Sequence, residues 1–80
     1  MFKQVNAVEY GLTGAIYTSN MSIAQKVVRR VEAGTLWVNT VGTHYLGMPF
    51  GGYKQSGLGR EDCMEELFQK TQCKVAHVRV

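Results

Sequence analysis

The most regular hydrophobic pattern of the chain runs over residues 21–33 and predicts an amphipathic helix. Apolar side chains recur there at a spacing of i, i+1, i+4, i+5 and i+8, which places them on one helix face. This apolar face consists of Ile23, Ala24, Val27, Val28 and Val31. The other face consists of Gln25, Lys26, Arg29, Arg30 and Glu32. Ser19 and Asn20 offer capping oxygens at the start, and Gly34 is expected to end the helix.

Two short segments with β-forming residues flank this helix. Residues 13–18 and residues 35–39 each predict a strand. A strand, a helix and a second strand in that order form a βαβ unit. Because the helix carries the chain back across the sheet, the two strands are expected to pair in parallel.

The two ends of the chain predict further elements. Residues 2–9 are interpreted as the tail of a helix that stops at Gly11. Residues 61–69 predict a short helix with acidic side chains in its first turns, where they complement the helix dipole. Residues 74–80 alternate in the manner of a half-buried strand.

Between the second strand and the last helix, residues 40–59 hold most of the turn-forming residues and the only proline. A long loop without regular structure inside a compact domain is usually functional. The complete pattern predicts an α/β fold: a βαβ unit followed by a long glycine-rich loop, a short helix and a C-terminal strand.

Length and charge narrow the class of protein. With 80 residues the chain has room for one small domain, whose core is marginal without partners. The formal charge of +3 is spread along the sequence, so a nucleic-acid partner is not expected. The one basic cluster, Lys26, Arg29 and Arg30, is interpreted as a solvated helix face. No apolar stretch is long enough for a membrane span.

The two cysteines predict neither a disulfide nor a catalytic thiolate. The first residues lack an apolar core of secretory length, so we expect a cytoplasmic, reducing environment with both thiols free. Acidic neighbours oppose ionisation of Cys63, and Cys73 has no obvious base nearby. Together with His44 and His77 they show no metal-ligand spacing. The chain is therefore expected to hold no catalytic residue and no metal.

The glycines do not form a nucleotide-binding motif either. The run from Gly52 to Gly57 begins like a phosphate-binding loop, but Leu58 and Gly59 stand where the motif needs lysine and serine or threonine. A GxGxxG dinucleotide fingerprint is also absent. No cofactor-binding residue is expected in this chain.

The glycine-rich segment carries a specific resemblance. Residues 49–61 read PFGGYKQSGLGRE and resemble the PFGGxKxSGxGRE signature of the aldehyde dehydrogenase superfamily at every defined position. Residues 9–12 resemble the YGL element of that family, and residues 32–39 its AGTxWVN element. The resemblance covers essentially the whole chain, but only the C-terminal end of a family member.

The resemblance implies an enzyme that oxidises an aldehyde to a carboxylic acid through a cysteine thiohemiacetal, hydride transfer to NAD or NADP, and thioester hydrolysis. In family members the cysteine, the base and most of the cofactor site lie upstream, so the isolated chain is expected to be inactive. The resemblance places residues 1–71 at the end of the catalytic domain and residues 72–80 in a strand of the oligomerisation sheet. A homo-oligomer, either a dimer or a tetramer, is implied.

The same resemblance assigns candidate substrate-binding residues. Phe50 is similar to a phenylalanine that walls the substrate tunnel, and His44 matches a position at the tunnel mouth that is often aromatic. Tyr45 lies beside it in the same loop. Histidine at this position leaves the substrate open, and a polar or aromatic aldehyde is conceivable. Asn39 is expected to hold the turn after the strand, while Arg60 and Glu61 are expected to pin the loop and cap the following helix.

Two other functions remain open at this point. The chain could be an independent binding module whose basic helix face meets an acidic partner. It could also be a remnant that folds poorly and has no function.

Overall fold

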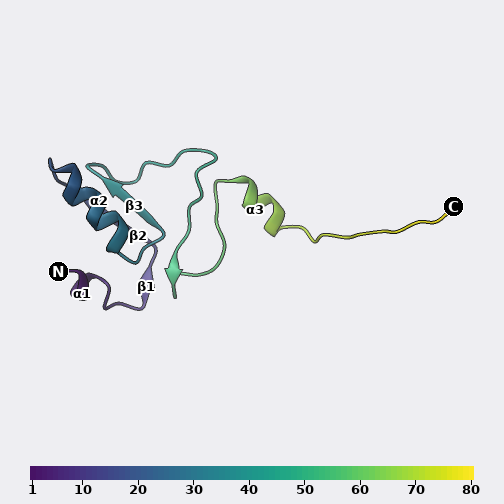
Figure 1. Cartoon of the computed structure of the whole chain (residues 1–80), viewed down its shortest axis with the longest axis horizontal. Helices are drawn as coiled ribbons and strands as arrows, with labels where there is room; N and C mark the ends of the chain where they lie inside the picture. Colours follow the sequence, from purple (N-terminus) through teal and green to yellow (C-terminus); the bar gives the residue numbers. More distant parts are fainter.

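The computed structural model describes all residues 1–80 as an α/β structure. Its elements are α1 (Phe2–Val5), β1 (Tyr10–Gly11), β2 (Thr13–Ile16), α2 (Met21–Arg30), β3 (Thr35–Val38), β4 (Tyr53–Lys54) and α3 (Met64–Gln69). Helix α2 lies beside β2 and β3, whereas α3 and the C-terminal segment extend away from them (Figure 1). No helix combines the length and the apolar composition that crossing a bilayer requires.

The predicted βαβ unit is confirmed. Strands β2 and β3 pair in parallel, with Thr13 opposite Thr35 and Ile16 opposite Val38. Helix α2 connects them, and the side chain of Asn20 caps its first turn by accepting a hydrogen bond from the Ile23 N–H at 3.2 Å. This cap satisfies one of the amide groups that a helix start leaves without a partner.

Helix α2 ends at Arg30, earlier than the predicted stop at Gly34. The cause is the side chain of Asn6, which is distant in sequence. Its amide nitrogen donates to the Arg30 carbonyl at 2.7 Å, and its oxygen accepts from the Glu32 N–H at 3.0 Å. These two hydrogen bonds satisfy backbone groups at the helix end, where the helix itself provides none.

The predicted helix over residues 2–9 is too long, and the role given to Gly11 is wrong. Helix α1 ends at Val5, and Gly11 belongs to strand β1, where it pairs with Tyr53 of β4 in an antiparallel ladder. Gly11 is buried, and a Cβ atom there would overlap the carbonyl oxygen of Glu32. Gly11 is needed because the backbone of Glu32 approaches it closely, and it does not end a helix.

The glycine-rich segment is more ordered than the predicted loop. Besides β4, it contains a backbone bridge between Phe50 and Glu61. This bridge keeps Glu61 extended, and Asp62 follows with a positive φ of 59°. Helix α3 therefore begins at Met64, and not at residue 61 as predicted.

The predicted strand over residues 74–80 does not form within this chain. The segment after α3 has no ladder partner, and its valines are exposed: Val75, Val78 and Val80. Since a strand is stabilised by its cross-strand hydrogen bonds, the alternating pattern alone cannot produce one.

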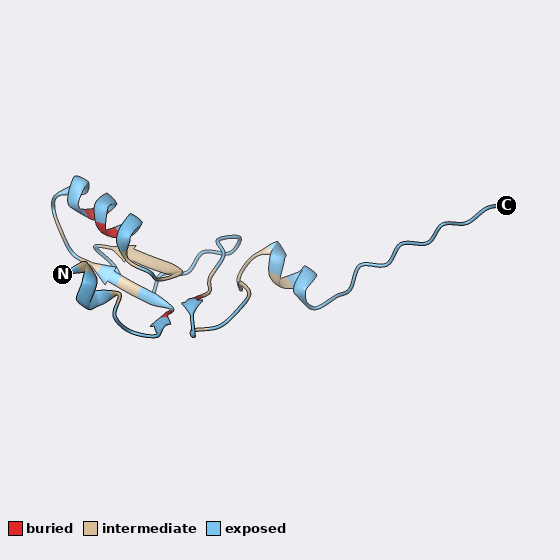
Figure 2. Cartoon of the chain, turned by 60° about the horizontal axis from the view of Figure 1, so that its bottom comes forward, coloured by how far each residue is buried: buried red, intermediate tan, exposed pale blue.

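The buried core is very small. Ala24 and Val27 of α2 are the only buried hydrophobic residues, and α2 lies beside the β2–β3 sheet (Figure 2). Two side chains of the predicted apolar helix face, Ile23 and Val28, are exposed. The radius of gyration is 17.4 Å, whereas a compact chain of this length would have one of about 12 Å. The chain thus leaves much of its apolar surface uncovered.

Candidate functional site

A hollow of about 410 Å³ lies between strand β3 and the loop that follows it. All three residues that the sequence predicts as substrate-binding, His44, Tyr45 and Phe50, line this hollow. Its other lining residues come from β3 and the same loop: Thr35, Leu36, Trp37, Thr40, Thr43, Met48 and Pro49. The size and the mainly apolar lining are those of a small-molecule site.

An aromatic cluster forms one wall of the hollow. The ring of His44 lies between those of Trp37 and Phe50, with centroid distances of 5.7 Å and 4.6 Å. The interplanar angles are 68° and 64°, so both pairs meet edge to face, which is a favoured geometry for aromatic rings. The three rings thus pack against one another along this wall.

Neither Trp37 nor Thr35 was predicted as a site residue, yet both line the hollow. The signal that could have identified them is strand alternation, because residues two apart on β3 project from the same face. The indole N–H of Trp37 donates to the Thr43 carbonyl at 2.8 Å, which ties the loop to the strand. The hydroxyl oxygen of Thr35 is buried and has no hydrogen-bond partner within the chain.

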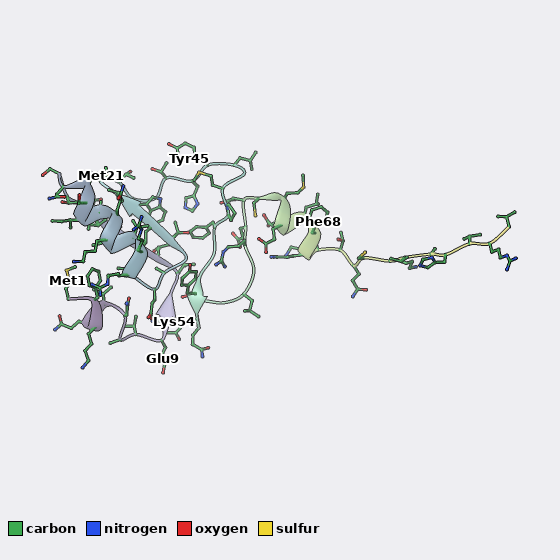
Figure 3. All side chains as sticks on the ribbon, viewed as in Figure 1. Met1, Glu9, Met21, Tyr45, Lys54 and Phe68 are labelled. Atoms are coloured by element: carbon green, nitrogen blue, oxygen red, sulfur yellow. The ribbon has the colours of Figure 1, made fainter.

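Tyr45 is the least enclosed of the three predicted residues, with 64% of its surface exposed. It lies on the outer side of the loop (Figure 3). Its ring forms none of the close aromatic pairs that His44 forms. The structure therefore puts Tyr45 at the rim of the hollow and Phe50 deeper in its wall.

Backbone and side-chain contacts hold the turn that follows β3. Asn39 has a positive φ of 58°, a conformation that asparagine tolerates better than most residues. Its side-chain oxygen accepts from the Thr18 N–H at 2.8 Å, and its own N–H donates to the Ile16 carbonyl at 2.8 Å. Asn39 thus holds the turn at the end of β3, as expected from the sequence.

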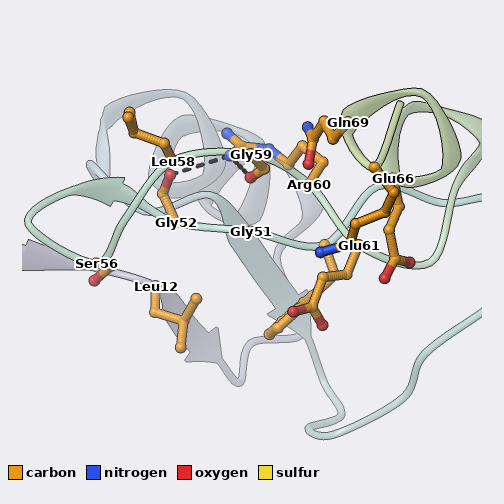
Figure 4. A pocket seen from close by; sticks show the side chains of 12 residues that line it. Leu12, Gly51, Gly52, Ser56, Leu58, Gly59, Arg60, Glu61, Glu66 and Gln69 are labelled. Atoms are coloured by element: carbon orange, nitrogen blue, oxygen red, sulfur yellow. Dashed lines mark hydrogen bonds between the residues drawn. The ribbon is translucent and has the colours of Figure 1, made fainter. Parts of the chain in front are cut away.

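A second hollow of about 220 Å³ lies on the other side of Phe50, between the glycine-rich segment and α3 (Figure 4). The guanidinium of Arg60 occupies one side of it and donates to the carbonyls of Gly52 at 3.1 Å and Gly59 at 2.8 Å. Arg60 therefore pins the loop, as predicted. The helix cap expected from this pair of residues is wrong, because α3 begins after Cys63 and has no side-chain cap. Before the helix, the Asp62 N–H donates to the carboxylate of Glu66 at 3.1 Å.

Lys54 and Ser56, two further residues of the signature, also hold the backbone. The ammonium of Lys54 donates to the carbonyls of Asn6 at 3.0 Å and Val8 at 3.2 Å, and it forms an ion pair with Glu32. The hydroxyl of Ser56 accepts from the Gly11 N–H at 2.8 Å. The charged and hydroxyl groups of this motif thus connect the N-terminal segment to the glycine-rich segment.

Neither hollow offers a phosphate-binding cradle. The only cation lining them besides Arg60 is Lys70, and the carboxylates of Glu61 and Glu66 line the same hollow. Arg60 already donates to two carbonyls, and the carboxylates would repel a pyrophosphate. The residues of this chain do not by themselves fit a dinucleotide, so none is assigned to one.

The remaining candidate chemistry lies elsewhere on the surface. Both cysteines are free thiols; Cys63 is half-buried and Cys73 is exposed. On the basic face of α2, the guanidinium of Arg30 lies over the ring of Phe2, 4.9 Å from its centroid. This contact gives Arg30 a structural role within the chain. No feature of the structure specifically favours an acidic partner.

Comparison with known proteins identifies relatives of this arrangement. A family model described as "Aldehyde dehydrogenase family" matches residues 1–76. The aldehyde dehydrogenase tropH of Talaromyces stipitatus is 45% identical over 80 residues, which are 100% of this chain and 16% of that protein. A betaine aldehyde dehydrogenase of Rhizobium etli is 45% identical over 75 residues, which are 94% of this chain and 15% of that protein.

Solved structures agree with the sequence comparison. The betaine aldehyde dehydrogenase of Staphylococcus aureus, solved in complex with NAD+, matches with a TM-score of 0.80 and 38% sequence identity. The match covers 85% of this chain and 14% of that chain. The chain thus spans between 14% and 16% of the length of these three relatives.

Proposed function

The chain belongs to the aldehyde dehydrogenase family, and on that premise we propose that it is the C-terminal part of a longer NAD- or NADP-dependent aldehyde dehydrogenase. We call this longer polypeptide the complete enzyme. It would convert an aldehyde, NAD(P)+ and water into a carboxylic acid, NAD(P)H and a proton. The reaction is proposed for the complete enzyme only, because this chain covers a small part of its relatives.

The observation that supports a substrate-binding role is the convergence of His44, Tyr45 and Phe50 on one hollow. An apolar wall beside a reacting carbonyl excludes bulk water and orients the substrate. Phe50 is suited to this role because the backbone holds it on both sides and its ring packs against His44. Tyr45, at the rim, would contact the part of the substrate farthest from the aldehyde.

The catalytic groups would come from the rest of the complete enzyme. A thiolate nucleophile needs a nearby cation or base to lower its pKa. Neither Cys63 nor Cys73 lies among the residues that line the hollow formed by His44, Tyr45 and Phe50. The cofactor, when bound, supplies the acceptor for the hydride that leaves the substrate carbon. This chain would form part of the wall of the substrate site, and residues upstream of it in the complete enzyme would catalyse the reaction.

The proposal extends to assembly and location. Residues 1–71 would complete the catalytic domain, and residues 72–80 would add a strand to an oligomerisation sheet. In support, the C-terminal segment exposes unpaired backbone groups and valine side chains that a neighbouring sheet edge could cover. The complete enzyme would be a homo-oligomer, either a dimer or a tetramer, and it would work in the cytoplasm with a small aldehyde as substrate.

The test compares the isolated chain with the complete enzyme. NADH and NADPH formation is followed by absorbance with propanal and benzaldehyde as substrates. We expect turnover by the complete enzyme and none above a buffer control by the isolated chain. Turnover by the isolated chain would refute the assignment of the catalytic groups to the rest of the complete enzyme. A soluble complete enzyme that oxidises no aldehyde with either cofactor would refute the function itself.

A further inference from the structure

His44 is the only residue lining the hollow beside β3 whose side chain can carry a positive charge. The lining residues include no lysine, arginine, aspartate or glutamate, and the only other titratable group among them is the phenol of Tyr45. Histidine side chains gain or lose a proton between about pH 5 and pH 8, a range in which phenols stay uncharged. The charge that this chain places in the hollow therefore depends on the imidazole of His44.

One carboxylate lies beside this imidazole. The Oδ2 atom of Asp62 is 3.4 Å from the Nδ1 atom of His44, and the two side chains are partly exposed, at 41% and 43%. This carboxylate attracts a protonated imidazole, and its negative charge offsets part of the positive charge of the ring. Asp62 does not line the hollow, so a molecule in the hollow would contact the imidazole and not the carboxylate. We therefore expect a protonated His44 to repel a cation in the hollow moderately.

The aromatic rings of the hollow would bring a cation close to His44. Quaternary ammonium groups bind over the faces of aromatic rings, within about 6 Å of the ring centroid. Trp37 and Phe50 offer two such rings, but the ring of His44 lies between them, with centroid distances of 5.7 Å and 4.6 Å. A cation that binds either ring would lie near the imidazole, and like charges would repel whenever His44 is protonated.

We propose that His44 makes the complete enzyme discriminate against aldehydes that carry a positive charge, and that this discrimination increases as the pH falls. The inference rests on the proposed function and adds a substrate class to it: uncharged aldehydes. The apolar side chains of Leu36, Met48 and Phe50 suit an uncharged, apolar substrate group. A neutral imidazole does not repel a cation, so positively charged aldehydes are oxidised better at high pH than at low pH.

The test uses two aldehydes of nearly the same shape. Betaine aldehyde carries a trimethylammonium group, and 3,3-dimethylbutanal carries an uncharged tert-butyl group in the same place. The selectivity is kcat/KM for 3,3-dimethylbutanal divided by kcat/KM for betaine aldehyde, both measured with the complete enzyme. Effects of pH on the catalytic groups act on both substrates and cancel in this ratio. We expect the ratio to be about fivefold higher at about pH 5.5 than at about pH 8.5.

Three variants assign the effect to the charge of His44. His44→Phe keeps an aromatic ring without a charge, and its ratio should be low at both pH values. His44→Lys is charged at both pH values, and its ratio should be high at both. Lys26→Met removes an exposed positive charge that does not line the hollow, and it should keep the pH dependence of the unmodified enzyme. A ratio that is independent of pH in the unmodified enzyme, or equally dependent on pH in His44→Phe, would overturn the inference alone. A soluble complete enzyme that oxidises no aldehyde at any pH would overturn the proposed function and the inference with it.

Discussion

Phe50 and Glu61 are hydrogen bonded to each other in both directions. The Phe50 N–H donates to the Glu61 carbonyl at 3.0 Å, and the Glu61 N–H donates to the Phe50 carbonyl at 2.6 Å. This bridge closes the glycine-rich segment at its base and holds the Phe50 backbone independently of its side chain. The ring of Phe50 then faces His44 on one side and the second hollow on the other.

The position of Phe50 predicts a selective effect on substrate binding. In the complete enzyme, Phe50→Ala should raise the KM for benzaldehyde by about tenfold, because it removes apolar surface worth about 1.5–3 kcal/mol when buried. The dissociation constant of the cofactor, measured by fluorescence titration, should change much less. Phe68→Ala is the matched control, since Phe68 is exposed on α3 away from the aromatic hollow. Equal losses of substrate and cofactor affinity would contradict the placement of Phe50.

Lys54 predicts an effect on stability. Lys54→Met keeps the length of the side chain but removes the donor to the carbonyls of Asn6 and Val8 and the partner of Glu32. The expected loss is about 2 kcal/mol, mainly from the two hydrogen bonds, because the Glu32 carboxylate is half exposed and its ion pair contributes little.

The temperature of half-inactivation of the complete enzyme measures this loss. Lys26→Met provides the control, because Lys26 forms no hydrogen bond or ion pair within the chain. A similar small change in both variants would show that Lys54 does not hold the N-terminal segment in place.

The contact between Gly34 and Gly51 predicts a strong steric effect. A Cβ atom at Gly34 would overlap the carbonyl oxygen of Gly51, so Gly34→Ala forces the turn before β3 away from the glycine-rich segment. We expect a loss of stability of about 2–3 kcal/mol and a displaced Phe50. At Gly42 a Cβ atom meets open space, and Gly42→Ala should cost only about 1 kcal/mol, through its positive φ of 77°.

Soluble yield, half-inactivation temperature and KM for benzaldehyde together report on these two variants. Gly34→Ala should affect all three, and Gly42→Ala should affect mainly the temperature. A Gly34→Ala enzyme as stable as the Gly42→Ala enzyme would show that the close approach is not required.

The small core predicts that the isolated chain lacks cooperative stability. Only two hydrophobic residues, Ala24 and Val27, are buried. Burial contributes about 0.8 kcal/mol per CH2 group, whereas ordering the backbone costs about 1–2 kcal/mol per residue. Far-UV circular dichroism of the isolated chain should therefore change gradually on heating. A sharp transition that coincides with a transition in tryptophan fluorescence would show that this core is sufficient.

Local sequence signals were enough to predict the βαβ unit. The period of α2, the cap at Asn20 and the β-forming residues of β2 and β3 all act over a few neighbouring positions. The end of α2 could not be predicted in this way, because it depends on the side chain of Asn6, 24 residues from Arg30. The pairing of Gly11 with Tyr53 could not be predicted either, because the residues near each of them in sequence do not indicate its partner.

The candidate substrate-binding residues were predicted from the resemblance to the family rather than from periodicity. The signature pointed to Phe50, and a separate position of the family, six residues earlier, pointed to His44; the structure places both on one hollow. The proximity of Asp62 to His44, with 3.4 Å between Oδ2 and Nδ1, could not be predicted, because it depends on the bridge between Phe50 and Glu61. The strand over residues 74–80 was predicted from alternation, but a strand requires a partner that this chain does not contain.

The most direct measurement of the central claim is a segment exchange with the betaine aldehyde dehydrogenase of Rhizobium etli. The aligned 75 residues of that enzyme are replaced by those of this chain, so that all upstream groups stay with the host. The kcat/KM ratio for benzaldehyde over propanal is then compared between the host and the exchanged enzyme. If this chain forms the wall of the substrate site, the exchanged enzyme stays active and the ratio changes by about tenfold. A soluble exchanged enzyme that is inactive, or one that retains the ratio of the host, would contradict the account.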